Sequence, residues 1–76
     1  MAIVTKVAHQ PLERDSKHSQ VDCTYDVVVE ADGEKYLQLD TYGSNQRQIK
    51  GKKSQSIRLS RSAIVQLKAI FEAHGF

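Results

Sequence analysis

The sequence predicts an α+β fold: a four-stranded antiparallel sheet followed by one C-terminal helix. Three observations indicate it. Several segments alternate between apolar and polar residues, turn-forming residues separate them, and the last apolar stretch repeats at helical spacing. With 76 residues the chain has room for one small domain, so we expect a single unit over residues 1–76.

The first strand is expected at Ile3–Ala8, a short run rich in β-branched residues that ends before Pro11. The polar segment that follows, near 10–19, is predicted to be a mobile loop. Two alternating segments, 21–30 and 35–42, then predict the second and third strands.

The length of the turn between these two strands follows from side-chain parity. A two-residue loop at Asp-Gly would put Leu37 and Leu39 on the polar face, because a one-residue slip inverts a strand. A three-residue loop instead pairs Val27 with Leu37. It also places Gly33 at the left-handed position of a type I turn with a bulge. The three-residue loop is therefore the prediction.

The C-terminal part of the chain is expected to contain the last strand and the helix. A second polar loop near 43–54 is predicted to be mobile, and the alternation at 55–59 predicts the fourth strand. Ser60 suits a helix N-cap, and Gly75 marks the end of the helix. The apolar residues between them form one stripe: Ala63, Ile64, Leu67, Ile70 and Phe71.

Charge is segregated along the chain. Residues 1–40 carry eight acidic and four basic residues, whereas residues 41–71 carry seven basic residues and no acidic one. The seven are Arg47, Lys50, Lys52, Lys53, Arg58, Arg61 and Lys68. Such a cluster can neutralise the phosphates of a nucleic acid and release counterions. The alternative is that these charges only solvate a mobile loop.

Aromatic residues bear on the same question, because unpaired bases stack on exposed rings. Tyr36 and Tyr42 belong to the outward-facing set of the third strand, where cross-strand packing or a dimer contact is the alternative role. The same register gives this face five acids: Asp22, Asp26, Glu30, Glu34 and Asp40. Acids repel phosphate, so a nucleic acid is expected to follow the 44–58 side.

Catalytic and metal-binding signatures are not recognised in the sequence. His9, His18 and His74 fall in three different elements without metal-ligand spacing, and no nucleophile motif is found. Cys23 lies on the inward-facing side of its strand and is expected to be a small core residue. We expect a non-enzymatic protein that uses no metal and no small-molecule cofactor.

The single cysteine also bears on stability and location. A chain this small is marginally stable, and one cysteine cannot form an internal disulfide, so self-association as a homodimer is the expected remedy. A free thiol, with no recognised signal peptide, indicates the cytoplasm. The apolar runs are too short to span a membrane.

Four short motifs occur in the order strand, basic turn, strand and helix. They are Tyr36-Leu37-Gln38-Leu39-Asp40, Gly51-Lys52-Lys53, Ile57-Arg58-Leu59-Ser60 and Gln66-Leu67-Lys68. Over residues 36–76 this arrangement resembles the single-stranded-DNA-binding domain of the transcriptional positive-cofactor family (the p15 coactivator) and its small bacterial relatives.

The resemblance implies a homodimer that binds single-stranded DNA or RNA with little sequence preference and acts in transcription regulation. Carried over by position, Lys52 and Lys53 would contact the nucleic-acid backbone, and Arg58 would be an outward-facing strand contact. The helix stripe would be shared between the sheet and the partner chain through Ile64, Leu67, Ile70 and Phe71. The chain has no Trp, so stacking would fall to its tyrosines.

Two other functions remain open from the sequence. One is a small protein-interaction module, an adaptor or inhibitor, that uses the acidic sheet face or the helix stripe. It predicts that charge reversal at Lys52 and Lys53 leaves function intact, while reversal at Asp26 and Glu30 abolishes it. The other is a binder of duplex or structured RNA, which competition between single and double strands would separate.

Overall fold

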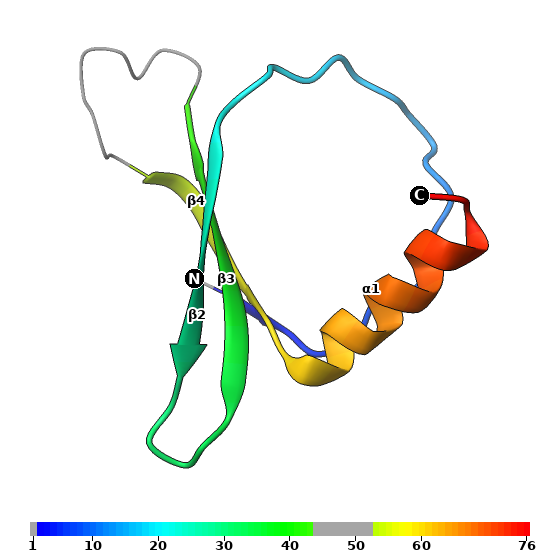
Figure 1. Cartoon of the computed structure of the whole chain (residues 1–76). Helices are drawn as coiled ribbons and strands as arrows, with labels where there is room; N and C mark the ends of the chain where they lie inside the picture. The colour runs from blue at the N-terminus through cyan, green and yellow to red at the C-terminus, as the bar shows by residue number, and fades with distance from the viewer. Residues whose placement is uncertain (1, 44–52) are drawn as a thin grey trace.

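The computed structural model describes residues 2–43 and 53–76 and contains one sheet and one helix (Figure 1). The elements are β1 Ala2–Val4, β2 Cys23–Val29, β3 Lys35–Tyr42, β4 Lys53–Leu59 and α1 Arg61–Ala73. The predicted α+β layout, with four strands before a C-terminal helix, is confirmed. The fourth strand begins earlier than expected, and residues 44–52 of the predicted second loop lie outside the described residues.

The sheet is mixed, so the prediction of a purely antiparallel sheet is wrong. Its strand order is β1-β4-β3-β2, with β1 parallel to β4 and the other two pairs antiparallel. The segment 5–22 leads from β1 at one edge to β2 at the other, and this long connection leaves β1 free to join β4 in parallel. The backbone N–H of Ser60 extends this pairing by donating to the carbonyl of Val4 at 3.0 Å.

The first strand is also shorter than the predicted Ile3–Ala8. It ends at Val4 because its partner Leu59 is the last residue of β4. The chain then turns toward α1, where the side chain of Gln66 holds it. The Gln66 carbonyl accepts from the backbone N–H of Val7 at 2.8 Å, and its amide donates to the carbonyl of Thr5 at 3.2 Å.

The predicted hairpin register between β2 and β3 is confirmed. Val27 pairs with Leu37, and Gly33 has the left-handed φ of 89° that the three-residue loop requires. The backbone N–H of Glu30 donates to the carbonyl of Glu34 at 2.8 Å and closes the loop. This register sorts the side chains of both strands onto two faces.

Both predicted helix ends are confirmed. The Ser60 hydroxyl accepts from the backbone N–H of Ala63 at 3.1 Å, as an N-cap does. At the other end Gly75 has φ of 76°, and the N–H of Phe76 donates back to the carbonyl of Phe71 at 2.8 Å. This is a Schellman motif, and the T-shaped pair of the two Phe rings, 6.2 Å between centroids, is its hydrophobic contact.

The apolar centre of the described residues is small and lies where β4 meets α1. Leu59 is 7% exposed and Ala63 is fully buried. Beyond this junction the helix diverges from the sheet (Figure 1). Residues 8–20 arch from the helix side back to β2, exposed and without regular secondary structure, and their predicted mobility stays a prediction. Within the described part of the chain, no helix is long and apolar enough to cross a membrane.

Candidate nucleic-acid interface

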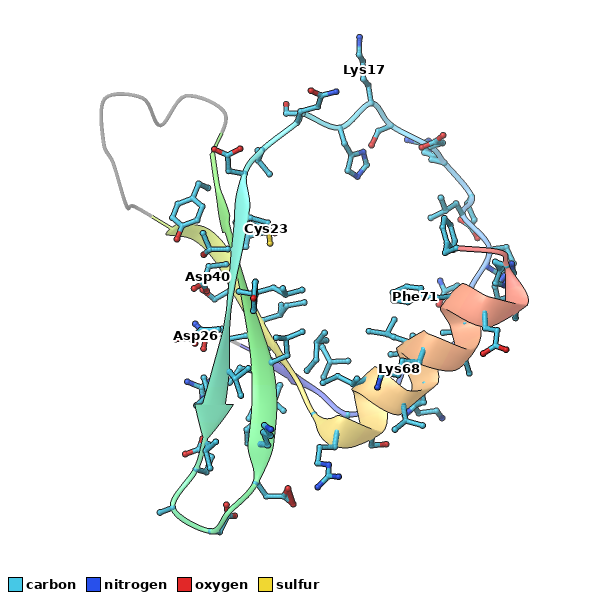
Figure 2. All side chains as sticks on the ribbon, viewed as in Figure 1. Lys17, Cys23, Asp26, Asp40, Lys68 and Phe71 are labelled. Atoms are coloured by element: carbon cyan, nitrogen blue, oxygen red, sulfur yellow. The ribbon has the colours of Figure 1, made fainter. Side chains whose placement is uncertain are left out.

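Alternate residues of β2, β3 and β4 point to opposite sides of the sheet. The polar face consists of Thr24, Asp26, Val28, Tyr36, Gln38, Asp40, Tyr42, Ser56 and Arg58. The apolar face consists of Cys23, Tyr25, Val27, Val29, Leu37, Leu39, Ile57 and Leu59, with Lys35, Thr41 and Gln55 at its ends. Figure 2 shows Asp26 and Asp40 on one side of the sheet and Cys23 on the other, the side toward the helix.

A continuous hydrogen-bonded network crosses the polar face. The Asp40 carboxylate accepts from the Ser56 hydroxyl at 2.5 Å and from the Gln38 amide at 3.0 Å. The Arg58 Nε donates to the Gln38 side-chain oxygen at 2.8 Å, and the Arg58 Nη1 pairs with the Glu30 carboxylate at 3.1 Å. Gln38 and Asp40 are only 9% and 8% exposed, so the centre of this face is closed to solvent.

The network changes the picture of an acidic outward face. Asp40 is buried and bonded rather than presented to solvent, and Glu30 is paired with Arg58. Asp22, Asp26 and Glu34 remain exposed. The repulsive acids therefore lie along β2 and the hairpin turn, away from β4.

Arg58 lies on the outward face as predicted, but it is already engaged. Its side chain is 22% exposed and bonds both Gln38 and Glu30. To grip a phosphate with both terminal nitrogens, this guanidinium has to give up Glu30. Arg58 is thus a basic group that is bonded directly to Gln38 at the centre of the polar face.

The tyrosines differ from the prediction in their accessibility. Tyr36 and Tyr42 are half-buried, and the Tyr42 hydroxyl lies 3.0 Å from the hydroxyl of Thr24. Tyr25 is the more accessible ring at 74% exposed, but it lies on the apolar face. Alternation along β2 places Tyr25 on that face, opposite Leu39, and nothing in the sequence signalled that the face would be uncovered.

Strand pairing between β3 and β4 is irregular near the start of β4. The register between β3 and β4 shifts between Thr41 and Tyr42, and beyond the shift Tyr42 pairs with Lys53. Among the other predicted contacts, Arg47, Lys50 and Lys52 lie outside the described residues.

The remaining predicted residues lie on the helix. Arg61 and Lys68 are exposed, and α1 lies on the other side of the sheet from Asp26 and Asp40 (Figure 2), so Lys68 does not join the polar face. In the predicted dimer stripe Ile64, Leu67 and Ile70 are half-buried. Its last member, Phe71, is 48% exposed.

Cys23 corrects one further expectation. It lies on the apolar face as predicted, but it is exposed rather than part of a core. The reason is that α1 covers the Leu59 end of this face and diverges from the sheet before reaching Cys23. Within residues 2–43 and 53–76, no group of three His, Cys, Asp or Glu residues is placed to hold a metal ion.

Comparisons with protein-family models, with curated proteins and with solved structures found no match. The resemblance to the positive-cofactor family therefore stays a prediction based on the four sequence motifs.

Proposed function

We propose that this chain binds single-stranded DNA or RNA as a homodimer in the cytoplasm, with little sequence preference. The observation that carries the proposal is the stretch of residues 41–71, which holds seven basic residues and no acid. Contacts to phosphates dominate the affinity of nucleic-acid binding. Basic residues without acids beside them in the sequence can make such contacts.

The geometry of the polar face supports this proposal by removing an objection to it. Acids on the same face would repel phosphate, but Asp40 is buried under its hydrogen bonds and Glu30 is paired with Arg58. The β4 side of the face consequently presents no unpaired acid among the described residues. A strand of nucleic acid that follows β4 from Arg58 toward the start of the strand at Lys53 avoids the acids of β2.

The proposed mechanism is mainly electrostatic. Lys52 and Lys53, with Arg47 and Lys50 nearby in the sequence, contact phosphates, and Arg58 joins them on exchanging Glu30 for phosphate. Tyr36 and Tyr42 are half-buried, so base stacking on them is a smaller contribution than in proteins that present open rings. A role in transcription regulation rests on the family resemblance alone.

The test is a fluorescence anisotropy titration of a labelled single-stranded oligonucleotide. If about four phosphates are neutralised, raising the salt from about 50 to about 200 mM weakens binding about fifty-fold. The double variant Lys52→Glu with Lys53→Glu should bind far more weakly. Its matched control, Lys6→Glu with Lys17→Glu, makes the same charge change at exposed residues outside the acid-free stretch.

Other outcomes of the same titration would contradict or change the proposal. Absent binding at low salt, or an affinity that ignores salt, contradicts the proposal. Equal losses in the two double variants would mean that net charge, not the acid-free stretch, attracts the oligonucleotide. Competition with duplex DNA and with structured RNA separates single-strand binding from the binding of duplex or structured RNA.

A protein-interaction module is the second candidate, and the exposed apolar face favours it. Val29 is 63% exposed and Tyr25 is 74% exposed, which is unusual for apolar residues on one face of a strand in a stand-alone domain. The charge-reversal test of this candidate is cleaner at Asp26 than at Glu30. Reversal at Glu30 also breaks the ion pair with Arg58, so its effect mixes binding with structure.

A further inference from the structure

The apolar face of the sheet is covered at one corner only. Strand pairing aligns it in rows, one of which runs from Leu59 through Leu37 to Val27. Exposure rises along this row, from 7% at Leu59 to 47% at Val27, and reaches 74% at Tyr25 further from the helix. The chain's own helix therefore protects the β4 corner of this face and leaves the β2 side open.

The helix stripe is open in the same way. Ala63 at the start of α1 is fully buried, whereas Phe71, two turns later, is 48% exposed. Phe71 lies on the sheet-facing side of the helix (Figure 2). The two uncovered apolar surfaces thus face the same space, and the divergence of the helix keeps them apart.

The chain exposes more surface than a folded monomer of the same mass. The chain exposes 6954 Å², and a folded monomer of its 8.6 kDa mass exposes about 4,700 Å². Its radius of gyration is 14.7 Å, against about 11 Å for a compact chain of this length. Part of the excess belongs to the exposed segment 8–20, and the total also counts residues 1 and 44–52, which lie outside the described residues. The whole exceeds the roughly 800 Å² that each partner buries in a standard interface.

The chemistry of the surface selects the occupant. On the apolar side of β2, β3 and β4, Lys35 is the one charged residue among the described positions, so a charged partner finds little to pair with there. A second copy brings a matching apolar helix stripe and an apolar sheet face of its own. A two-fold axis lets each helix cover the sheet of the other copy, which closes both open surfaces at once.

We propose that α1 of each chain lies on the apolar sheet face of a second copy, so that Val27, Tyr25 and Phe71 become buried between two chains. The proposal rests on the homodimer of the proposed function but not on nucleic-acid binding. It adds the sheet to the helix stripe as the interface. It also assigns Cys23 to the rim or interior of that interface.

Analytical ultracentrifugation of the full chain tests the assembly. The wild-type chain is expected to sediment at twice its mass at micromolar concentration. Val27→Asp should shift it to the mass of one chain, because Val27 is open in the single chain and buried in the dimer. Leu12→Asp, an equal change at a residue that is 81% exposed in the 8–20 segment, should leave the dimer intact.

Two further measurements keep the test decisive if Val27→Asp fails to fold. Labelling of Cys23 in the wild type by a thiol reagent should slow several-fold as the chain concentration rises. In a Cys23→Ser background, a mixture of Val27→Cys chains and Phe71→Cys chains should form a mixed disulfide dimer in preference to either self-pair. That preference locates the helix of one copy on the sheet of the other.

The outcomes that would overturn the inference are distinct from those that affect nucleic-acid binding. A wild-type chain that stays monomeric at all concentrations overturns it, as does a dimer that Val27→Asp leaves unchanged. Preferential self-pairing of the Phe71→Cys chains would show helix against helix and overturn the proposed arrangement. Anisotropy on the same samples is a separate readout: a dimer without oligonucleotide binding contradicts only the proposed function.

Discussion

The two faces of the sheet differ in a direction opposite to that of most small domains. On the polar face Gln38 and Asp40 are less than a tenth exposed, whereas on the apolar face Tyr25 and Val29 are 74% and 63% exposed. The polar face satisfies itself within one chain, because its donors and acceptors bond one another within β3 and between β3 and β4. The apolar face cannot be satisfied by contacts within the sheet, and a second layer of structure has to cover it.

This difference follows from the physics of the two interactions. A buried polar group is stable when its hydrogen bonds are made locally, and neighbouring strands supply partners at fixed spacing. An apolar face gains about 25 cal/mol for each Å² removed from water, which requires a second layer. Here the only second layer in the described chain is α1, and it reaches Leu59 but not Val29.

The largest expected loss of stability comes from the one closed corner of the apolar face. Leu59→Ala should lower the free energy of unfolding by about 2–4 kcal/mol, because it leaves a cavity beside Ala63. Urea unfolding at a fixed chain concentration measures it, since a dimer's stability depends on concentration. Leu12→Ala, at an exposed leucine, should change stability by less than about 0.5 kcal/mol.

A loss below about 1 kcal/mol for Leu59→Ala would contradict this comparison, since it would mean that the corner is not packed. A loss for Leu12→Ala as large as that for Leu59→Ala would mean that segment 8–20 is packed against something the single chain does not show.

The next effect belongs to the polar face. Asp40→Ala removes the acceptor of the Gln38 amide and the Ser56 hydroxyl and leaves buried donors without it, so stability should fall by about 1–3 kcal/mol. Asp22→Ala, an exposed acid of the same sequence region, should cost far less. Equal values for the two variants would show that the network contributes nothing beyond a surface charge.

The sequence predicted local features well, because neighbouring residues decide them. The parity of Val27 and Leu37 fixed the hairpin loop, Gly33 supplied its left-handed position, and Ser60 capped the helix. It did not predict the direction of β1. The β-branched run at Ile3–Val4 pairs equally well in either direction, and long-range contacts such as that between Val4 and Ser60 make the choice.

The candidate site was predicted less completely for a related reason. Alternation assigns a residue to a face but does not say what covers that face, so Cys23 was expected in a core and is exposed. Charge counting placed Glu30 and Asp40 on one acidic surface. It could not show that Arg58 pairs with Glu30 or that Ser56 hydrogen-bonds Asp40, because both partners lie on β4, far away in the sequence.

The smallest expected change in stability links the polar face to binding. The Arg58–Glu30 pair is partly exposed, so Glu30→Gln should lower stability by only about 0.5 kcal/mol. The same change loosens the hold on the Arg58 guanidinium and makes it available to phosphate. Oligonucleotide affinity should therefore rise, and the dependence of log affinity on log salt should steepen by about 0.7 for one added phosphate contact.

Glu34→Gln is the matched control for this prediction. It removes the same charge from an exposed acid in the hairpin turn, and no ion pair joins Glu34 to a described residue. A larger gain in affinity for Glu30→Gln than for Glu34→Gln isolates the release of Arg58 from the change in net charge. Equal gains would mean that Arg58 stays in its network during binding, and that the polar face serves the fold while phosphate is held by the lysines alone.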